Sequence, residues 1–281
     1  MDPVEYIRSH SGELIPAETG ESPVLTKFSD IKAIVFDIYG TLLISTAGDI
    51  SLAGGETAPE KAMQKALEVT GIPADPAEFL ARYYTLIEAG NCARDIPFPE
   101  VEIREIWQAL LIEFGHDPAK ACDLCIAYEC EVNPVWPMPG LSDCLDPIRS
   151  SGRILGIISN AQFYTPLLFP ALQNQTLEQL GFDPCAMVFS YQIREGKPSR
   201  KLYSLLAKNL KNRYDISPNE ILYIGNDRLK DIWPAQQEGL KTVLFAGDAR
   251  SLRWRKDDAR LATVQPDAVV THLNQIPKLF L

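Results

Sequence analysis

The stretch Ile31–Ile44, IKAIVFDIYGTLLI, decides how the rest of the chain is organised. Its apolar run at 33–36 ends at the carboxylate of Asp37, and Gly40 then precedes a second apolar run. Nearly continuous hydrophobic residues are typical of a parallel strand that is buried on both faces. Open α/β sheets bind ligands outside the carboxyl ends of such strands, so Asp37 stands where a functional group is expected. Gly40 permits a tight turn directly after it.

The remaining pattern predicts an α/β fold with a doubly wound, Rossmann-like parallel sheet. Short apolar runs such as ILGIIS (154–159), ILYIG (221–225) and KTVLF (241–245) alternate with helical segments, as in consecutive βαβ units. Residues 59–131 instead hold four helical patterns in succession, which indicates a small bundle. We therefore expect an extended N-terminal arm (1–30), an α/β core (31–55 and 135–281) and a four-helix insertion (56–134).

Composition narrows the classes of function. The chain has 281 residues, of which 46% are hydrophobic and 23% charged, as in ordinary globular proteins. Since it has no apolar run of about eighteen residues and no apolar core near its start, we expect neither a membrane span nor a secretory signal. A formal charge of -10 argues against a nucleic-acid surface, although it permits a small anionic substrate. With six cysteines interpreted as free thiols, we expect a cytoplasmic protein, while its oligomeric state stays open.

Polar side chains follow three further strands. Ser159 and Asn160 come after the second strand, where a hydroxyl and backbone N–H groups can hold an anionic oxygen. Lys197 lies in GKPSRKLY, where an ammonium would reduce repulsion between carboxylates and an anionic substrate. The segment GNDRLKD after the fourth strand brings Asp227 and Asp231, and carboxylates are ligands that Mg²⁺ prefers.

Taken in this order, the four segments resemble the motifs of the haloacid dehalogenase-like hydrolase superfamily, and the helical insertion resembles its cap. The resemblance implies that Asp37 is the nucleophile that becomes a covalent intermediate, and that Lys197 is catalytic. It implies substrate contacts at the residues that follow the first two strands. The residues concerned are Tyr39, Thr41, Ser159 and Asn160. Mg²⁺ would bind Asp37, the Tyr39 carbonyl and Asp227, with Asn226 and Asp231 orienting this shell.

Tyr39, two residues after Asp37, leaves two reaction types open, phosphate hydrolysis and dehalogenation. Phosphatases of this superfamily usually carry a second Asp at this position as general acid and base, and losing such a group costs about 10²–10⁴ in rate. The form D-x-Y-G-T, with the Ser159–Asn160 pair, is that of the metal-independent 2-haloacid dehalogenases. Against a dehalogenase, no Arg precedes Arg82 in the insertion to hold a halide, and Asn226–Asp227 is phosphatase-like.

We therefore expect Mg²⁺-dependent hydrolysis of a small phosphorylated metabolite through an aspartyl-phosphate at Asp37. A metal-independent dehalogenase is the alternative, in which Arg82 or Arg94 reaches the site from the insertion. A protein that binds a small anion without turnover is the third reading.

Overall fold

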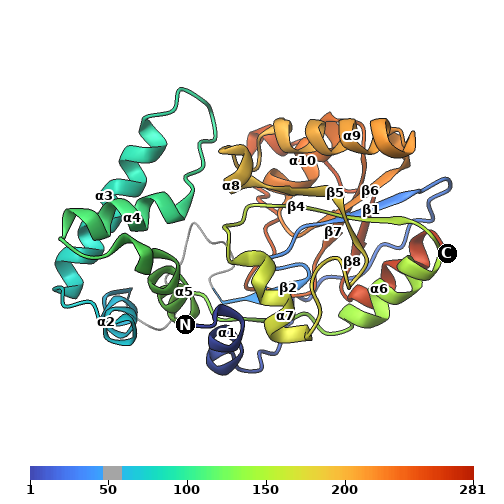
Figure 1. Ribbon diagram of the computed structural model, residues 1–281. Coiled ribbons are helices and arrows are strands. Elements are labelled where there is room, and N and C mark those ends of the chain that lie inside the picture. Colours follow the sequence, from blue (N-terminus) through green and yellow to red (C-terminus); the bar gives the residue numbers. More distant parts are fainter. Residues whose placement is uncertain (47–58) are drawn as a thin grey trace.

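The computed structural model describes residues 1–46 and 59–281, which form an α/β body and a helical body (Figure 1). We call the described residues 59–134 the cap. The predicted boundary at residues 55–56 lies outside the described residues. The sequence DPAEFL predicts Asp75 as a helix N-cap, and its carboxylate does accept a hydrogen bond from the Glu78 N–H. Within the described part of the cap the α-helices are α2 (Pro59–Thr70), α3 (Pro76–Cys92), α4 (Ile103–Glu113) and α5 (Ala121–Val132).

The core sheet has six parallel strands in the order β5-β4-β1-β6-β7-β8, which confirms the predicted α/β class. Strand β1 lies between β4 and β6, so the residues that follow these three strands meet at one edge of the sheet. The strands are β1 (Ala33–Phe36), β4 (Ile154–Ser159), β5 (Phe182–Phe189), β6 (Ile221–Gly225), β7 (Lys241–Phe245) and β8 (Ala268–Val270).

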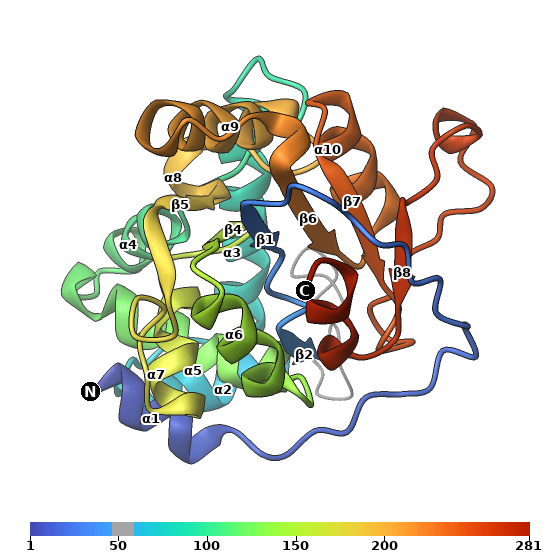
Figure 2. The same cartoon turned by 90° about the vertical axis from the view of Figure 1, so that its right-hand side faces the viewer.

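Helices cover both faces of this sheet (Figure 2). Because side chains alternate along a strand, Ile34 and Phe36 pack on one face and Ala33 and Val35 on the other. All four are fully buried, which explains the uninterrupted apolar run. Helices α6 (Leu141–Ser150) and α7 (Leu168–Gln173) cover the first face, and α9 (Arg200–Tyr214) and α10 (Trp233–Gln237) cover the second.

The two connections between core and cap lie next to each other. Strand β2 (Leu43–Ser45) pairs antiparallel with β3 (Val135–Pro137), and the Ser45 hydroxyl donates to the Asn133 amide oxygen at 2.7 Å. The chain therefore enters and leaves the cap through one short ribbon, at the carboxyl edge of the sheet where Asp37 lies.

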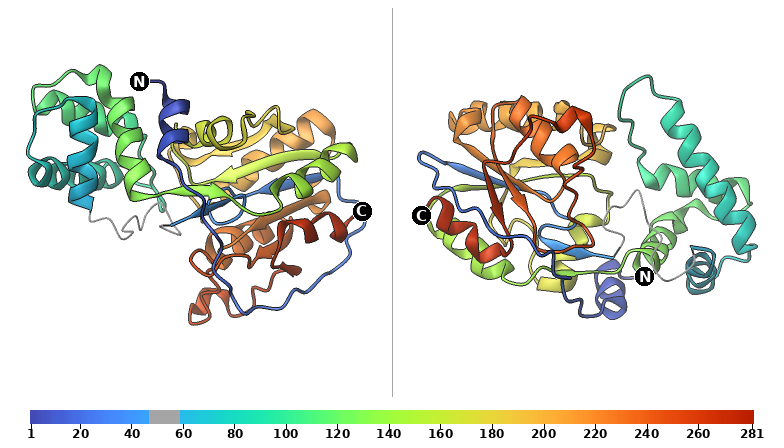
Figure 3. Two further views of the ribbon diagram at one scale, coloured as in Figure 1. Left: turned by 90° about the horizontal axis from the view of Figure 1, so that it is seen from below. Right: turned by 180° about the vertical axis from the view of Figure 1, so that it is seen from behind.

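The N-terminal arm is not extended throughout, because it begins with helix α1 (Pro3–His10). Asp2 caps the helix, Pro3 occupies its first turn, and Ile7 is buried against α5 and α7. A helix of eight residues is too short to show a clear period in the sequence. The arm then crosses the core to its far side, where Phe28 donates to the Leu279 carbonyl (Figure 3).

Several other elements differ from the sequence prediction. The sequence at 165–180 predicts one helix, whereas the structure has a 3₁₀ turn (Thr165–Leu167) and α7, which ends at Gln173 because Asn174 is left-handed. The sequence does not predict the short helix α8 (Ser190–Ile193). The final segment HLNQIPKLF predicts a closing helix, whereas the structure has two 3₁₀ turns there, Leu273–Gln275 and Pro277–Leu279. None of the described helices combines the length and apolar character needed to cross a bilayer.

Candidate active site

Asp37 lies at the carboxyl end of the central strand. Its backbone N–H donates to the Ile224 carbonyl, so the ladder with β6 continues up to the functional residue. Gly40 then turns the chain with a φ of +78°, and a side chain there would clash with the Ser251 Cβ at 2.5 Å. The turn leaves the Asp37 side chain 9% exposed at the sheet edge.

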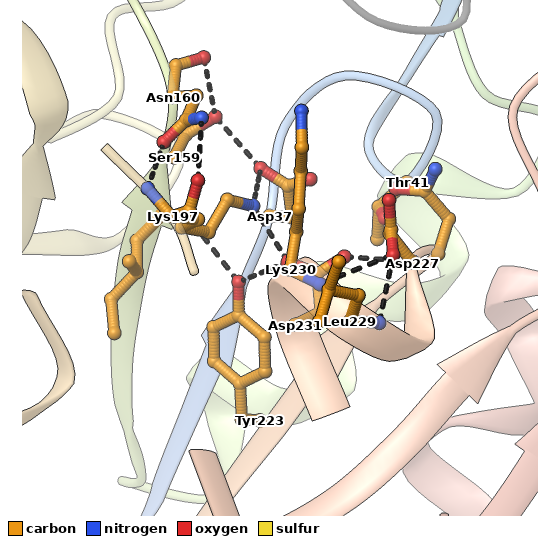
Figure 4. Close-up of polar contacts among 12 residues, drawn as sticks. Asp37, Thr41, Ser159, Asn160, Lys197, Tyr223, Asp227, Leu229, Lys230 and Asp231 are labelled. Atoms are coloured by element: carbon orange, nitrogen blue, oxygen red, sulfur yellow. Dashed lines mark hydrogen bonds and ion pairs between the residues drawn. The ribbon is translucent and has the colours of Figure 1, made fainter. Parts of the chain in front are cut away.

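Three groups surround the Asp37 carboxylate (Figure 4). The Ser159 hydroxyl donates to Oδ1 at 2.7 Å, and the Lys197 ammonium lies 2.9 Å from the same oxygen. The ammonium also contacts Asp231 Oδ1 at 2.6 Å. Within the described part of the chain Oδ2 of Asp37 has no hydrogen-bond partner, so one oxygen is held while the other is available for attack.

Asp231 reaches Lys197 because Gly225 leaves it room. A Cβ at Gly225 would lie 2.3 Å from the Asp231 Cγ, so only glycine allows the carboxylate to fold back beneath the end of β6. The Asp231 carboxylate accepts hydrogen bonds from the Tyr223 hydroxyl and from the Asp227 N–H at 3.0 and 2.8 Å. It is fully buried and orients the ammonium that contacts Asp37.

Burial and charge set the protonation of this cluster. Burial alone would lower the pKa of Lys197, but the charges of Asp231 and Asp37 outweigh it and raise that pKa above its usual value. Burial, with the negative charges of Asp37 and Asp227, raises the pKa of Asp231 to about 6, and Lys197 opposes this shift. At neutral pH the ammonium is therefore charged and bridges two carboxylates.

Asp227, the expected metal ligand, is occupied by other partners. Its Oδ1 accepts from the backbone N–H groups of Leu229 and Lys230 and from Arg255 Nε at 2.8, 3.1 and 2.8 Å. Its Oδ2 accepts from Arg255 Nη2 at 2.5 Å. Figure 4 shows the backbone contacts, which cap the helical turn that follows.

These residues do not fit Mg²⁺ as the sequence predicted. A guanidinium on both oxygens of Asp227 opposes a dication there, and the neutral Asn226 brings no charge. Among residues 1–46 and 59–281, no group of three or more His, Cys, Asp or Glu side chains is placed to hold a metal ion. The ion pair with Arg255 thus opposes the predicted role of Asp227 as a magnesium ligand.

The other predicted site residues mainly support the backbone around Asp37. The Thr41 hydroxyl donates to the Asn226 amide oxygen at 3.2 Å, and the Asn226 amide donates to the Ser251 carbonyl. The Asn160 amide oxygen accepts from the Lys197 N–H at 2.7 Å, which fixes the segment carrying the ammonium. Asn160 also lines the adjoining cleft.

The Tyr39 side chain is buried beside the site. Its hydroxyl shares a hydrogen bond of 2.9 Å with the Thr165 hydroxyl. Burial raises the pKa of Tyr39 far above its usual value, so the phenol stays protonated. It cannot supply the acid and base chemistry of the carboxylate that phosphatases carry at this position.

A cleft of about 800 Å³ opens between the cap and the core and reaches the site at Lys197. Aromatic rings from the cap, Tyr83, Tyr84 and Tyr128, form one wall. Its floor comes from the core. The polar core residues that line it are Asn160, Gln162, Lys197 and Lys230. The cleft is therefore polar where it reaches Lys197, and the cap adds the carboxyl groups of Glu100 and Glu129 to its aromatic wall.

A family model described as haloacid dehalogenase-like hydrolase matches residues 31–239 of the chain. The chain belongs to this hydrolase family. The match spans the predicted motifs from Asp37 to Asp231 and the cap between them. No curated protein matches the sequence.

Solved structures with the fold of this hydrolase include both phosphatases and dehalogenases. A HAD phosphatase from Thermococcus onnurineus is 21% identical with a TM-score of 0.52, and 89% of this chain covers 97% of that one. A 2-haloacid dehalogenase from Pseudomonas syringae pv. Tomato DC3000 is 19% identical with a TM-score of 0.55, at the same coverages. A defluorinating L-2-haloacid dehalogenase is 17% identical with a TM-score of 0.51, covering 94% and 98%. At these identities the likeness shows the fold alone.

Three residues of this hydrolase's site were missed in the sequence. Tyr223 lies inside the apolar run of a strand, so the sequence did not indicate that its hydroxyl donates a hydrogen bond to Asp231. Arg255 stands in the basic segment RWRK, far along the chain from Asp227. Lys230 lines the cleft from the π-helical turn Arg228–Ile232, which the sequence did not predict.

The dehalogenase alternative expected Arg82 or Arg94 of the cap to reach the site. Arg82 forms an ion pair with Glu113 at 2.8 Å, with both side chains about 40% exposed. Arg94 is exposed. Neither lines the cleft, so any cation that holds a substrate anion comes from elsewhere.

Proposed function

We propose that this hydrolase removes halide from a small 2-halogenated carboxylate without a metal ion, with Asp37 attacking carbon. The observation that carries the proposal is the pairing of Asp227 with Arg255. It takes both oxygens of the second carboxylate that phosphoryl transfer with Mg²⁺ would need. The attack of a carboxylate on carbon needs no such ligand.

The absence of a carboxylate at Tyr39 supports the same reaction. A phosphate ester with an alkoxide leaving group requires a proton donor, and the Tyr39 phenol is buried on Thr165 with its pKa raised by burial. A halide leaves as a stable anion and requires no proton. A phosphatase would need a free carboxylate at Asp227 for Mg²⁺ and a proton donor at position 39, and a dehalogenase uses neither.

The chemistry proceeds through an ester at Asp37. Oδ2 attacks C2 of the substrate and forms a C–O bond, while the carbon–halogen bond breaks and its electron pair leaves with the halide. Water then attacks the carbonyl carbon of this ester, which regenerates the Asp37 carboxylate and releases a 2-hydroxy acid and one proton. Throughout, Ser159 and Lys197 hold Oδ1 and orient the carboxylate.

The phosphatase prediction makes the opposite claim and is tested alongside. We would incubate the purified protein with 2-chloropropionate, acetyl phosphate or p-nitrophenyl phosphate, each with Mg²⁺ and with EDTA. The proposal predicts chloride release that persists in EDTA and disappears in Asp37→Asn. Phosphate release that requires Mg²⁺, without chloride release, would overturn it.

A single turnover in H₂¹⁸O tests the nucleophile itself. Because water attacks the ester carbonyl, the first ¹⁸O is expected in Asp37 and not in the 2-hydroxy acid. Mass spectrometry of the peptide that contains Asp37 reads this label directly. Label appearing first in the product would mean that water attacks the substrate and that Asp37 is not the nucleophile.

A further inference from the structure

The charged side chains in and around the cleft are mostly carboxyl groups. Among the described residues, four carboxyl groups and two ammonium groups either line the cleft or belong to the ion pairs of Lys197. The carboxyl groups are those of Asp37, Asp231, Glu100 and Glu129, and the ammonium groups are those of Lys197 and Lys230. Even with Glu129 protonated, negative charge exceeds positive charge. This excess attracts a substrate that carries a positive charge in addition to its acid group.

Glu129 has no partner of opposite charge in the described part of the chain. The carboxylates at the nucleophile are paired through Lys197. Glu100 accepts hydrogen bonds from two core side chains, and Lys230 is engaged in an interaction of its own. Only burial and a tyrosine hydroxyl act on the pKa of Glu129, and the sequence of residues 47–58 contains no basic side chain. A cation that pairs with this carboxyl group therefore comes from outside the chain.

Tyrosine rings surround the Glu129 carboxyl group on the cap side of the cleft. Burial raises the pKa of Glu129, and the nearby Tyr164 hydroxyl opposes this shift. That hydroxyl is itself buried and has no hydrogen-bond partner of normal geometry among the described residues. A carboxyl group among aromatic rings is suited to an organic cation, and the hydroxyl oxygen is a second acceptor for its N–H groups. The tyrosines that lie close enough to be affected by the charge of Glu129 are Tyr39, Tyr83, Tyr128 and Tyr164, of which the last three line the cleft.

We propose that Glu129 binds an ammonium group that the substrate carries at the end away from the reacting carbon. The cleft of about 800 Å³ has room for such a substrate, because an acid of three carbons fills only a small part of it. The proposal deepens the dehalogenase assignment and rests on it for the halogenated acid at the other end. Glu129 is then a specificity-determining residue of the cap, while Asp37 and Lys197 carry the chemistry in the core.

Binding of butylammonium, which has no leaving group, tests this subsite independently of turnover. Titration followed by NMR would compare butylammonium with 1-butanol, a neutral probe of similar size, on the wild type, Glu129→Gln, Glu129→Asp and Glu88→Gln. Glu88→Gln is the control, because that glutamate is exposed on α3. We expect Glu129→Gln to weaken butylammonium binding at least about tenfold, since it removes a charge-assisted hydrogen bond. Glu129→Asp should still prefer the cation over 1-butanol, and Glu88→Gln should bind as the wild type does.

Two matched acids carry the same comparison into turnover. In 6-amino-2-chlorohexanoate an ammonium group stands where 2-chloroheptanoate has a methyl group. The wild type should release chloride from the first with a kcat/KM at least about tenfold higher, and Glu129→Gln should lose this preference.

The wild type alone can contradict the subsite. Binding of 1-butanol as tight as that of butylammonium would overturn the proposal, as would equal butylammonium binding by the wild type and Glu129→Gln. Chloride release with equal kcat/KM for the two acids would overturn the subsite and leave the reaction standing. Butylammonium binding that depends on Glu129, without chloride release from either acid, would support the subsite and contradict only the reaction.

Discussion

The Arg255 guanidinium contacts both oxygens of the Asp227 carboxylate, with Nε 2.8 Å from Oδ1 and Nη2 2.5 Å from Oδ2. This pair joins the connection between β7 and β8 to the turn after β6. The backbone of Arg253 pairs with the same turn, since its N–H donates to the Asn226 carbonyl and its carbonyl accepts from the Arg228 N–H. The turn that carries Lys230 and Asp231 is therefore held by a segment that joins two other strands.

Arg255→Met should lower the free energy of unfolding by about 2–3 kcal/mol, because it leaves a buried carboxylate without its charged partner. Asp227→Asn should cost less, since the amide oxygen can still cap the N–H groups of Leu229 and Lys230. Urea denaturation of both variants and of the double variant gives the coupling energy of the pair. Additive effects in that cycle would mean that the contact contributes nothing measurable.

Lys197→Met should be among the most damaging changes in the core. It leaves Asp37 and Asp231 buried without a cation, and breaking a buried pair in this way costs about 3–5 kcal/mol. The pKa of Asp231 should rise further, because Lys197 is the group that opposes its upward shift. The double variant Lys197→Met with Asp231→Asn should recover part of the stability, and failure to recover any would contradict a charge-based role.

The sequence predicted those site residues that stand directly after an apolar run or in a short motif. Asp37 and Ser159 stand directly after apolar runs, and strands of one parallel sheet bring such residues to a common edge. The structure places Ser159 and Lys197 on Asp37, and Asp231 on Lys197. The class of the fold and the cap helices followed from the same periodicity.

What the sequence did not predict depends on contacts between distant residues. Asp227 is an acid in a suitable segment, but its availability for a metal depends on Arg255, from a loop without a period. Lys230 lines the cleft from a π-helical turn after β6, a form that the sequence did not predict. Helix α1 is short and stabilised by packing on α5 and α7, so its own residues carried too little pattern.

Gly225→Ala tests whether the close approach of Asp231 is required. A Cβ at 2.3 Å from the Asp231 Cγ forces the carboxylate away from Lys197, and we expect a loss of at least about 2 kcal/mol of stability. Turnover should fall with it, because the ammonium loses the group that orients it. Gly12→Ala is the matched control, since open space surrounds that glycine. Wild-type stability of Gly225→Ala would show that the turn after β6 adapts freely.

Glu129 on α5 should make the stability of the chain depend on pH. Burial raises its pKa to about 7 from an ordinary value of 4.5, and it lines the cleft. The titratable side chains around Glu129 are tyrosines and cysteines, which are neutral at pH 7. None of them is a cation that would lower the pKa of Glu129. They are Tyr39, Tyr83, Tyr128, Tyr164, Cys125 and Cys130.

Between about pH 4.5 and pH 7 the folded chain keeps the Glu129 proton that the unfolded chain has released. The folded state then binds more protons, so the free energy of unfolding falls as pH rises, by at most about 1.4 kcal/mol per pH unit. Glu129→Gln should remove this part of the slope, whereas Glu88→Gln, exposed on α3, should keep it. Denaturation curves at pH 5, 6, 7 and 8 measure the difference. A slope unchanged in Glu129→Gln would mean that this carboxyl ionises in the folded chain as it does in water.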